Sequence, residues 1–193
     1  MADFLDVLVQ DARENINNGY YDIAVQVPTS SISLKRAILE SKCAPIIAEV
    51  KVASPSLGII RKSVDAKNVA MAMENGGAVG ISVITEPKNF GGSLASLIEV
   101  RKAVKLPTLM KDIIVSPIQL EAASKAGANA VLLIESLFNR RYCERDVHDM
   151  IARAHSTKLE VLLETHSEEE FLSALNTSAD LIGINNRDLR TLK

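Results

Sequence analysis

Residues 46–56 read Ile-Ile-Ala-Glu-Val-Lys-Val-Ala-Ser-Pro-Ser, and this stretch decides how the rest of the chain is interpreted. The short apolar run after Pro45 has the length and β-branched content of a buried strand. Because side chains alternate along a strand, Glu49 and Lys51 share one face with Ile47. Buried charges must be paired or must meet a ligand. The stretch therefore predicts a strand ending in a charge pair, although a lysine there can also mark only the emergence of the chain into solvent.

Downstream of this stretch, strand-like and helix-like segments alternate. Short apolar runs predict strands at 45–51, 78–84, 107–114, 130–134, 159–164 and 181–184. Apolar stripes with helical spacing predict helices between them, at about 65–75, 94–100, 117–125, 145–156 and 167–175. Two further helices, at 3–17 and 33–41, precede the first strand. Because the strand starts are 22 to 33 residues apart, the pattern predicts βαβ units and a parallel sheet.

The alternation fits both a closed barrel and an open doubly wound sheet. The sequence has no Gly-x-Gly-x-x-Gly after a strand and no Gly-x-x-x-x-Gly-Lys-Ser/Thr, which weakens the case for a nucleotide-binding open sheet. In either architecture, ligands bind at the carboxyl ends of the strands. The functional site is therefore expected where the predicted strands end.

The composition indicates one soluble globular domain. The chain has 193 residues, 47% of them hydrophobic, and a net charge of −2, which gives no reason to expect nucleic acid or a membrane as partner. Cys43 and Cys143 lie far apart and are expected to be thiols in a reducing compartment. The start of the chain lacks the pattern of a signal peptide, and no apolar run reaches the length of a membrane span. We therefore expect a cytoplasmic protein.

Polar side chains occur at nearly every predicted strand end. They are Lys51, Thr85, Glu86, Lys111, Asp112, Glu135, Glu164, Thr165, His166, Asn185, Asn186 and Arg187. Parity along the strands predicts which residues share a face: Lys111 with Leu109, Glu164 with Leu162, and Asn185 with Gly183 and Leu181. Two lysines, carboxylates and an amide at one mouth favour proton transfer on an anionic substrate.

General chemistry suggests roles for these groups. Adjacent ammonium groups lower each other's pKa, which would make one lysine a usable general acid. A carboxylate such as Glu164 in a partly dry pocket is expected to have a raised pKa and to act as a base. His166 has the parity of Glu164 but precedes a predicted capping box formed by Ser167 and Glu170, so we interpret it as structural.

Five stretches, taken in order, resemble the indole-3-glycerol phosphate synthase family. They are 46–56 quoted above, Ser-Val-Ile-Thr-Glu-Pro-Lys-Asn-Phe-Gly-Gly-Ser at 82–93, Met-Lys-Asp-Ile-Ile-Val at 110–115, Ala-Val-Leu-Leu-Ile at 130–134 and Ile-Gly-Ile-Asn-Asn-Arg-Asp-Leu at 182–189. The resemblance covers the whole chain and implies an α/β fold, the (β/α)8 TIM barrel. It implies conversion of 1-(2-carboxyphenylamino)-1-deoxyribulose 5-phosphate to indole-3-glycerol phosphate with loss of CO2 and water, in tryptophan biosynthesis. It implies no metal and no cofactor.

The resemblance also assigns roles to residues. Lys111 resembles the general acid that protonates the substrate carbonyl, and Glu164 resembles the general base of the later dehydration. Lys51 matches the lysine that holds the substrate carboxylate, with Glu49 orienting it, although Lys51 could instead be an acid in the dehydration. The remaining matches to substrate-contacting positions are Ser54, Phe90, Leu132, Asn185, Arg187 and Leu189.

The chain departs from the family in several places. Val52 and Leu57 stand where many relatives have basic residues, and Ile113 stands where an aromatic residue is common. The family barrel has eight strands, whereas six are predicted here, so we expect a single barrel domain over 1–193 that lacks the last two βα units. The loops of those units hold the substrate phosphate in this fold. Residues 1–44 are expected to form an N-terminal helical extension that covers the barrel mouth or floor. The family implies a monomer, but a chain of this length could associate.

Three alternatives remain open from sequence. A phosphosugar isomerase on the same barrel, similar to phosphoribosylanthranilate isomerase, would want a cysteine or carboxylate base where Lys51 stands. A Schiff-base aldolase would use Lys51 or Lys111. The third alternative is an inactive truncated barrel that keeps the rim but lacks the phosphate site.

Overall fold

The computed structural model describes residues 3–28, 32–55, 58–60 and 65–186. The helices are α1 (Phe4–Asn17), α2 (Leu34–Leu39), α3 (Ala66–Asn75), α4 (Leu94–Ala103), α5 (Pro117–Lys125), α6 (Glu135–Asn139), α7 (Val147–Ser156) and α8 (Glu168–Ala174). The strands of the main sheet are β1 (Ile47–Val50), β4 (Gly80–Ile84), β5 (Thr108–Lys111), β6 (Ala130–Ile134), β7 (Glu160–Thr165) and β8 (Leu181–Ile184). A separate antiparallel pair joins β2 (Ala53–Ser54) to β3 (Gly58–Ile59).

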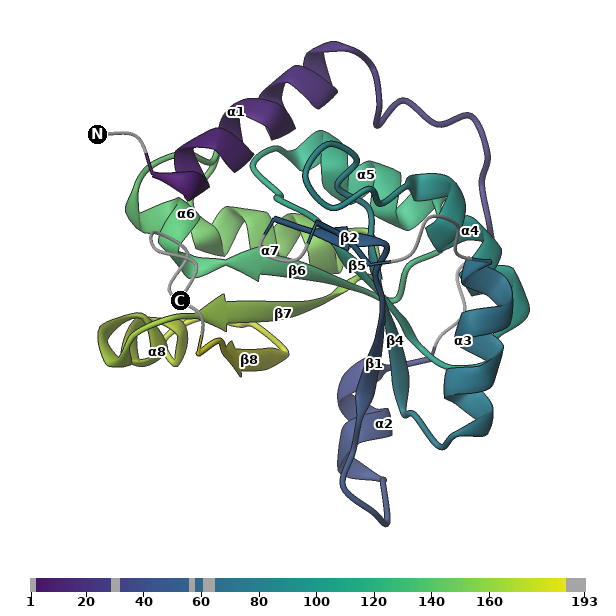
Figure 1. Cartoon of the computed structure of the whole chain (residues 1–193). Coiled ribbons are helices and arrows are strands. Elements are labelled where there is room, and N and C mark those ends of the chain that lie inside the picture. Colours follow the sequence, from purple (N-terminus) through teal and green to yellow (C-terminus); the bar gives the residue numbers. More distant parts are fainter. Residues whose placement is uncertain (1–2, 29–31, 56–57, 61–64, 187–193) are drawn as a thin grey trace.

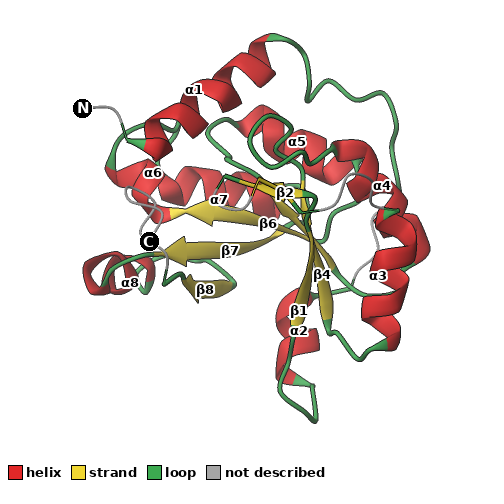
Figure 2. Cartoon of the chain, in the orientation of Figure 1, coloured by secondary structure: helices red, strands yellow, loops and turns green. Residues whose placement is uncertain are grey.

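The main sheet has six parallel strands in the order β1-β4-β5-β6-β7-β8, so neighbours in the sequence of strands are neighbours in space. The sheet curls strongly, and its strands turn from upright at β1 to horizontal at β7 in Figure 1. Helices α3, α4, α5 and α7 lie along the outer side of this curve (Figure 2). The predicted partial (β/α)8 barrel is confirmed. Within the described residues, β1 and β8 form the two edges of the sheet.

Alternation along the strands separates an outer core from an inner face. The outward side chains of the middle strands pack against the helices, and they are Ile81, Val83, Met110, Val131, Leu133, Val161 and Leu163. Each of them is fully buried. The side chains between them point to the inside of the curve, which is where the site residues lie.

Helix α2 closes the floor of the inner face. Leu34 is completely buried and packs with Leu109 and Ala130 where the strands begin. A Cβ at Gly80 would lie 2.6 Å from Leu34 Cδ1, so the leucine fills the space that a side chain there would need. The Glu160 carboxylate of β7 caps the start of the helix by accepting hydrogen bonds from the Leu34 amide at 2.7 Å and the Ser33 hydroxyl. A carboxylate at a helix N-terminus is favoured by the exposed amides and the helix dipole.

Helix α1 covers the opposite end. It begins with a capping box between Asp3 and Asp6. Its apolar side packs with residues of β6, α6 and the loop after β5, and this cluster consists of Leu5, Leu8, Val9, Ala12, Ile113, Val115, Leu132, Ile134 and Leu137. The N-terminal segment therefore covers both the floor, with α2, and part of the mouth, with α1.

Several predicted details were wrong. The strand predicted at 107–114 ends at Lys111, and residues 112–116 are irregular. The two-residue strands β2 and β3 and the five-residue helix α6 were not predicted. Ser167 does cap α8 through the Glu170 amide, but the Glu170 side chain accepts from His166 N instead of completing a capping box.

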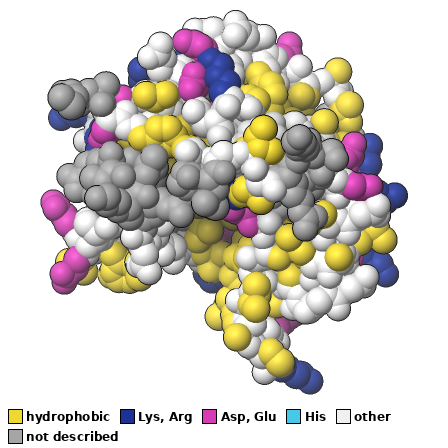
Figure 3. All heavy atoms as spheres, viewed as in Figure 1, with side chains coloured by type: hydrophobic (Ala, Val, Ile, Leu, Met, Phe, Trp, Pro, Cys, Tyr) yellow, Lys and Arg dark blue, Asp and Glu magenta, His cyan; other side chains and the backbone are white. Residues whose placement is uncertain are grey.

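An apolar area lies on the surface at the β1 edge. Figure 3 shows apolar side chains gathered at the lower tip, over α2 and the start of β1, where Leu39 and Ile46 are 74% and 62% exposed. Of the helices in the described ranges, none has the length and apolar character needed to cross a membrane.

Candidate active site

Glu49 lies between the two lysines of the inner face. Lys111 Nζ donates to Glu49 Oε2 at 2.7 Å, and Lys51 Nζ lies 3.5 Å from Glu49 Oε1. These side chains are about one quarter to one third exposed, so the cluster opens to the mouth of the curve. The sequence suggested two adjacent ammonium groups. In the structure, the Glu49 carboxylate lies between them and contacts both.

Glu164 faces the same interior from β7. Asn185 Nδ2, just beyond β8, donates to Glu164 Oε1 at 3.0 Å, and His166 Nε2 lies 3.3 Å from the same oxygen. Burial alone would raise the pKa of Glu164, but His166, Asn185 and the charge of Lys111 together lower it. The expectation of a raised pKa was therefore wrong, because the pocket supplies donors and positive charge to the carboxylate.

His166 contacts a second carboxylate. Its Nδ1 lies 3.6 Å from Glu170 Oε2 of α8, and its side chain is 12% exposed. Burial lowers the pKa of His166, but Glu164 and Glu170 outweigh this effect and raise it. The sequence analysis interpreted His166 as a structural residue that precedes a helix, and it did not predict that the ring lies between two carboxylates.

An apolar wall with one cationic neighbour lies beside the lysines. Phe90 packs against the α1 cluster that contains Leu132 and Ile113. Lys51 Nζ lies 5.7 Å from the centre of the Phe90 ring, a distance at which a cation is attracted to an aromatic face. The Phe90 carbonyl also accepts from Ala53 N at 3.2 Å, which ties this wall to β2. Ser54, the neighbour of Ala53, is buried in β2.

The loop that carries Phe90 is fixed internally by Glu86. The Glu86 carboxylate, 1% exposed, accepts hydrogen bonds from the amides of Lys88, Asn89 and Phe90 at 2.9, 2.7 and 3.0 Å. A buried carboxylate that accepts three amides organises a turn without regular secondary structure.

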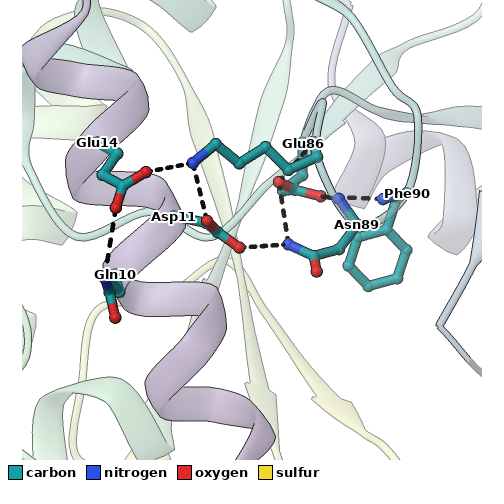
Figure 4. Close-up of polar contacts among 7 residues, drawn as sticks. Gln10, Asp11, Glu14, Glu86, Asn89 and Phe90 are labelled. Carbon is teal, nitrogen blue, oxygen red and sulfur yellow. Dashed lines mark hydrogen bonds and ion pairs between the residues drawn. The ribbon is translucent and has the colours of Figure 1, made fainter.

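Helix α1 holds the same loop from outside (Figure 4). Lys88 Nζ lies 2.9 Å from Asp11 Oδ1 and 2.5 Å from Glu14 Oε2. Asn89 Nδ2 donates to Asp11 Oδ2 at 2.9 Å. Two residues of the loop thus bind two acidic residues on one face of α1, and we call this set the α1 latch (Asp11, Glu14, Lys88 and Asn89).

Four of the polar residues at strand ends do not face the mouth. Thr85, Glu86, Asp112 and Glu135 are at most 2% exposed. Asp112 accepts from Thr85 Oγ1 at 2.5 Å and from Ile113 N at 2.8 Å, and burial raises its pKa to about 6. Glu135 accepts from Ser173 Oγ at 2.8 Å. These groups support the loops around the site instead of lining it, contrary to the expectation that all strand ends share one rim.

A residue of the inner face escaped the sequence analysis. Ser82 of β4 is in register with Glu49 and is 4% exposed. Its hydroxyl has no hydrogen-bond partner among the described residues. The sequence did contain an indication of this residue, because Ser82 is a polar residue at an inward-facing position of an otherwise apolar strand.

A cleft of about 750 Å³ opens beside the Glu164 carboxylate, at the carboxyl ends of β6, β7 and β8. Its lining includes Arg140, His166, Glu170, Phe171 and Asn185. Arg187, Leu189 and Leu57 lie outside the described residues. Across the described ranges, no three His, Cys, Asp or Glu side chains form a group able to hold a metal ion.

Comparison with known proteins agrees with this arrangement. The family model of indole-3-glycerol phosphate synthase matches residues 5–193. Proteins of that name from Methanocaldococcus jannaschii, Carboxydothermus hydrogenoformans and Shouchella clausii are 43%, 44% and 38% identical over 95%, 83% and 98% of this chain. The chain spans 69%, 60% and 72% of their respective lengths.

Solved structures give a likeness of fold alone. A crystal structure of mandelate oxidase covers 95% of this chain at 15% identity with a TM-score of 0.50, and the match spans 62% of that chain.

Proposed function

The chain belongs to the indole-3-glycerol phosphate synthase family, and from this premise we propose that it converts 1-(2-carboxyphenylamino)-1-deoxyribulose 5-phosphate to indole-3-glycerol phosphate. The observation that carries the proposal is the Glu49 carboxylate between Lys51 and Lys111, facing Glu164 across the same interior. The phosphosugar isomerase alternative is not favoured, because Lys51 occupies the strand end where that reaction needs a base.

The reaction joins a ring carbon to a ketone, and the ketone oxygen must gain a proton as the bond forms. Lys111 is the proposed donor, because its ammonium is held at the mouth by Glu49 at 2.7 Å. The same ring carbon then releases its carboxylate as CO2, which restores aromaticity. Proton transfer by a positioned group typically contributes about 10²- to 10⁴-fold to a rate.

Loss of water completes the indole ring and needs a base. Glu164 is the proposed base because its carboxylate faces the inner side of the curve, and its lowered pKa keeps it in the ionised form that can accept a proton, although it makes the carboxylate a weaker base. Asn185 fixes the carboxylate through its amide. Glu164 accepts the proton that the five-membered ring loses, and the departing hydroxyl takes up a proton from the Lys51 ammonium and leaves as water, so the step is balanced in atoms and charge.

Binding of the substrate is assigned to the remaining neighbours. Lys51 is the proposed partner of the substrate carboxylate, since its ammonium lies at the mouth beside the Phe90 ring. Phe90 and Leu132 are the proposed apolar wall for the aromatic ring. By family likeness the proposal extends to Ser54, Arg187 and Leu189.

The wider context is also proposed. Residues 1–44 are the proposed N-terminal extension of a single barrel domain that spans 1–193. The free thiols of Cys43 and Cys143 support a place in the reducing cytoplasm.

The test is turnover of the named substrate by this chain, followed by the fluorescence of the indole product. Lys111→Ala should lower kcat by about 10²- to 10⁴-fold while the dissociation constant of the substrate changes little. Lys102→Ala, an exposed lysine of α4, is the matched control and should leave both unchanged. No turnover by the unmodified chain, or full turnover by Lys111→Ala, would overturn the proposal.

A further inference from the structure

His166 occupies a position between two carboxylates from different elements. Its Nε2 lies 3.3 Å from Glu164 Oε1 at the end of β7, and its Nδ1 lies 3.6 Å from Glu170 Oε2 in the first turn of α8. These are distances of an ion pair rather than of short hydrogen bonds. Neither ring nitrogen makes a hydrogen bond within the described residues, but each lies close to a carboxylate oxygen, and this negative charge on both sides favours the imidazolium form.

Glu170 is itself held in place. Its Oε1 accepts from Ser136 Oγ of α6 at 2.5 Å, and its Oε2 accepts from His166 N at 2.7 Å. The carboxylate that would ordinarily complete the helix cap is therefore directed to the histidine. Glu170 is therefore anchored to α6 and to the turn between β7 and α8, and this holds its carboxylate in place beside the His166 ring.

The ring is nearly enclosed but borders the site. It is 12% exposed and lines the 750 Å³ cleft together with Asn185. Besides Glu170, the other charged groups of that cleft are Arg140, which follows α6, and Glu168 of α8. Arg140 is paired with Asp3, with 2.7 Å between Nη1 and Oδ2, and the charge of Lys111 also lowers the pKa of Glu164.

We propose that His166 is a positioning residue for Glu164, that it orients this carboxylate and holds its negative charge, and that Glu170 anchors the ring. This rests on the proposed function, in which Glu164 accepts a proton. Two carboxylates on one imidazole form a Glu170–His166–Glu164 chain that runs from α8 to the mouth of the barrel. The raised pKa of His166 and the lowered pKa of Glu164 have the directions that such mutual stabilisation requires.

The kinetic test is the pH dependence of kcat/KM in His166→Gln and Glu170→Gln. Without the imidazolium the Glu164 carboxylate loses a stabilising charge, so its pKa rises and the acid limb should move to higher pH by about one unit. At pH values below the pKa of the acid limb, this shift corresponds to a kcat/KM about tenfold lower than that of the unmodified protein. Glu170→Gln should move the limb in the same direction by less. His148→Gln, an exposed histidine of α7, is the matched control and should leave the limb in place. An unchanged limb in His166→Gln, or a lower plateau with no movement of the limb, overturns the proposal.

A second readout does not depend on turnover. Titration of the His166 ring by NMR should give a pKa above that of an ordinary histidine, and Glu164→Gln should lower it by about one unit. Circular dichroism and urea unfolding verify that each variant is folded. Equal His166 titration in the unmodified protein and in Glu164→Gln overturns the positioning role. If the chain has no turnover but the titration is coupled, the proposed reaction fails while the pair itself stands.

Discussion

The ammonium of Lys111 donates a 2.7 Å hydrogen bond to the carboxylate of Glu49, although their strands are separated by β4 in the sheet. The contact crosses the inside of the curve, where parallel strands direct alternate side chains to one interior. Because Glu49 also lies 3.5 Å from Lys51, one carboxylate orders both lysines of the site.

Glu49→Gln should therefore disturb both lysines at once. Removal of the charge leaves two ammonium groups beside a neutral amide, and we expect kcat to fall by more than about tenfold because the proton donor loses its orientation. The free energy of unfolding should change by less than about 1 kcal/mol, since partly exposed ion pairs contribute little. Steady-state kinetics and urea unfolding measure the two quantities. Glu99→Gln, an exposed glutamate of α4, should change neither, and normal kinetics in Glu49→Gln would contradict the prediction.

The α1 latch should act on substrate affinity. Lys88→Ala and Asp11→Ala both release the loop that carries Phe90, so each should raise KM severalfold with a smaller effect on kcat. A double-mutant cycle should show coupling between the two substitutions in substrate binding, because either one alone already breaks the contact between Lys88 and Asp11. Arg36→Ala breaks an exposed ion pair with Glu40 on α2 and is the control. Additive effects of Lys88→Ala and Asp11→Ala would show that the latch does not act as a unit.

Asp112 should make stability depend on pH. Burial raises its pKa to about 6, while its unfolded value is near 4. The folded state binds this proton more tightly, so the stabilising contribution is full below about pH 4 and is lost as the pH rises through about 6. Asp112→Asn removes the titration, and its free energy of unfolding relative to the unmodified protein should rise by about 1–3 kcal/mol between pH 4 and 7. Urea unfolding at each pH measures this difference, and a difference independent of pH would refute the prediction.

The two thiols should react at different rates. Cys43 is exposed, whereas burial raises the pKa of the Cys143 thiol to about 12. Since the thiolate is the reactive form, one thiol should react with Ellman's reagent at pH 8 in the folded protein and both in urea. Cys43→Ser should abolish the fast phase. A fast phase that persists in this variant would place the reactive thiol at Cys143.

Leu34 should carry much of the stability of the floor. It is fully buried among the starts of the strands, so Leu34→Ala should lower the free energy of unfolding by about 2–5 kcal/mol. Leu39→Ala on the same helix is the control, because Leu39 is 74% exposed and its loss should cost less than about 0.5 kcal/mol. Similar costs for the two variants, measured by urea unfolding, would show that the floor is not closed by α2.

Periodicity explains what could be predicted from the sequence. Within a strand the alternation of side chains is strict, so the inward positions of Glu49, Lys111 and Glu164 follow from their parity with Ile47, Leu109 and Leu162. The order of the six strands follows from the spacing of βαβ units. Roles for these residues came from family resemblance, which periodicity alone does not supply.

Beyond the last residue of a strand, parity no longer predicts direction. Asp112 and Glu86 point toward the backbone of their own loops and accept hydrogen bonds from its amides. Buried amides need partners, and only the tertiary structure determines which side chain supplies them. Glu170 shows the same competition, since the histidine amide and Ser136 take the carboxylate that a local capping box would use. The hairpin of β2 and β3 and the short helix α6 are too short to show a period.

The cap that Glu160 places on α2 also orders the events of folding. The Leu34 amide and its acceptor are 126 residues apart, so the contact closes most of the chain into one loop. Closing so long a loop before β7 is paired would cost entropy without the packing that compensates for it. Leu34 also packs against Leu109 and Ala130 of β5 and β6, so only the cap of α2, and not its packing, depends on β7. We therefore expect the capped floor of the barrel to be completed only after β7 has joined the sheet.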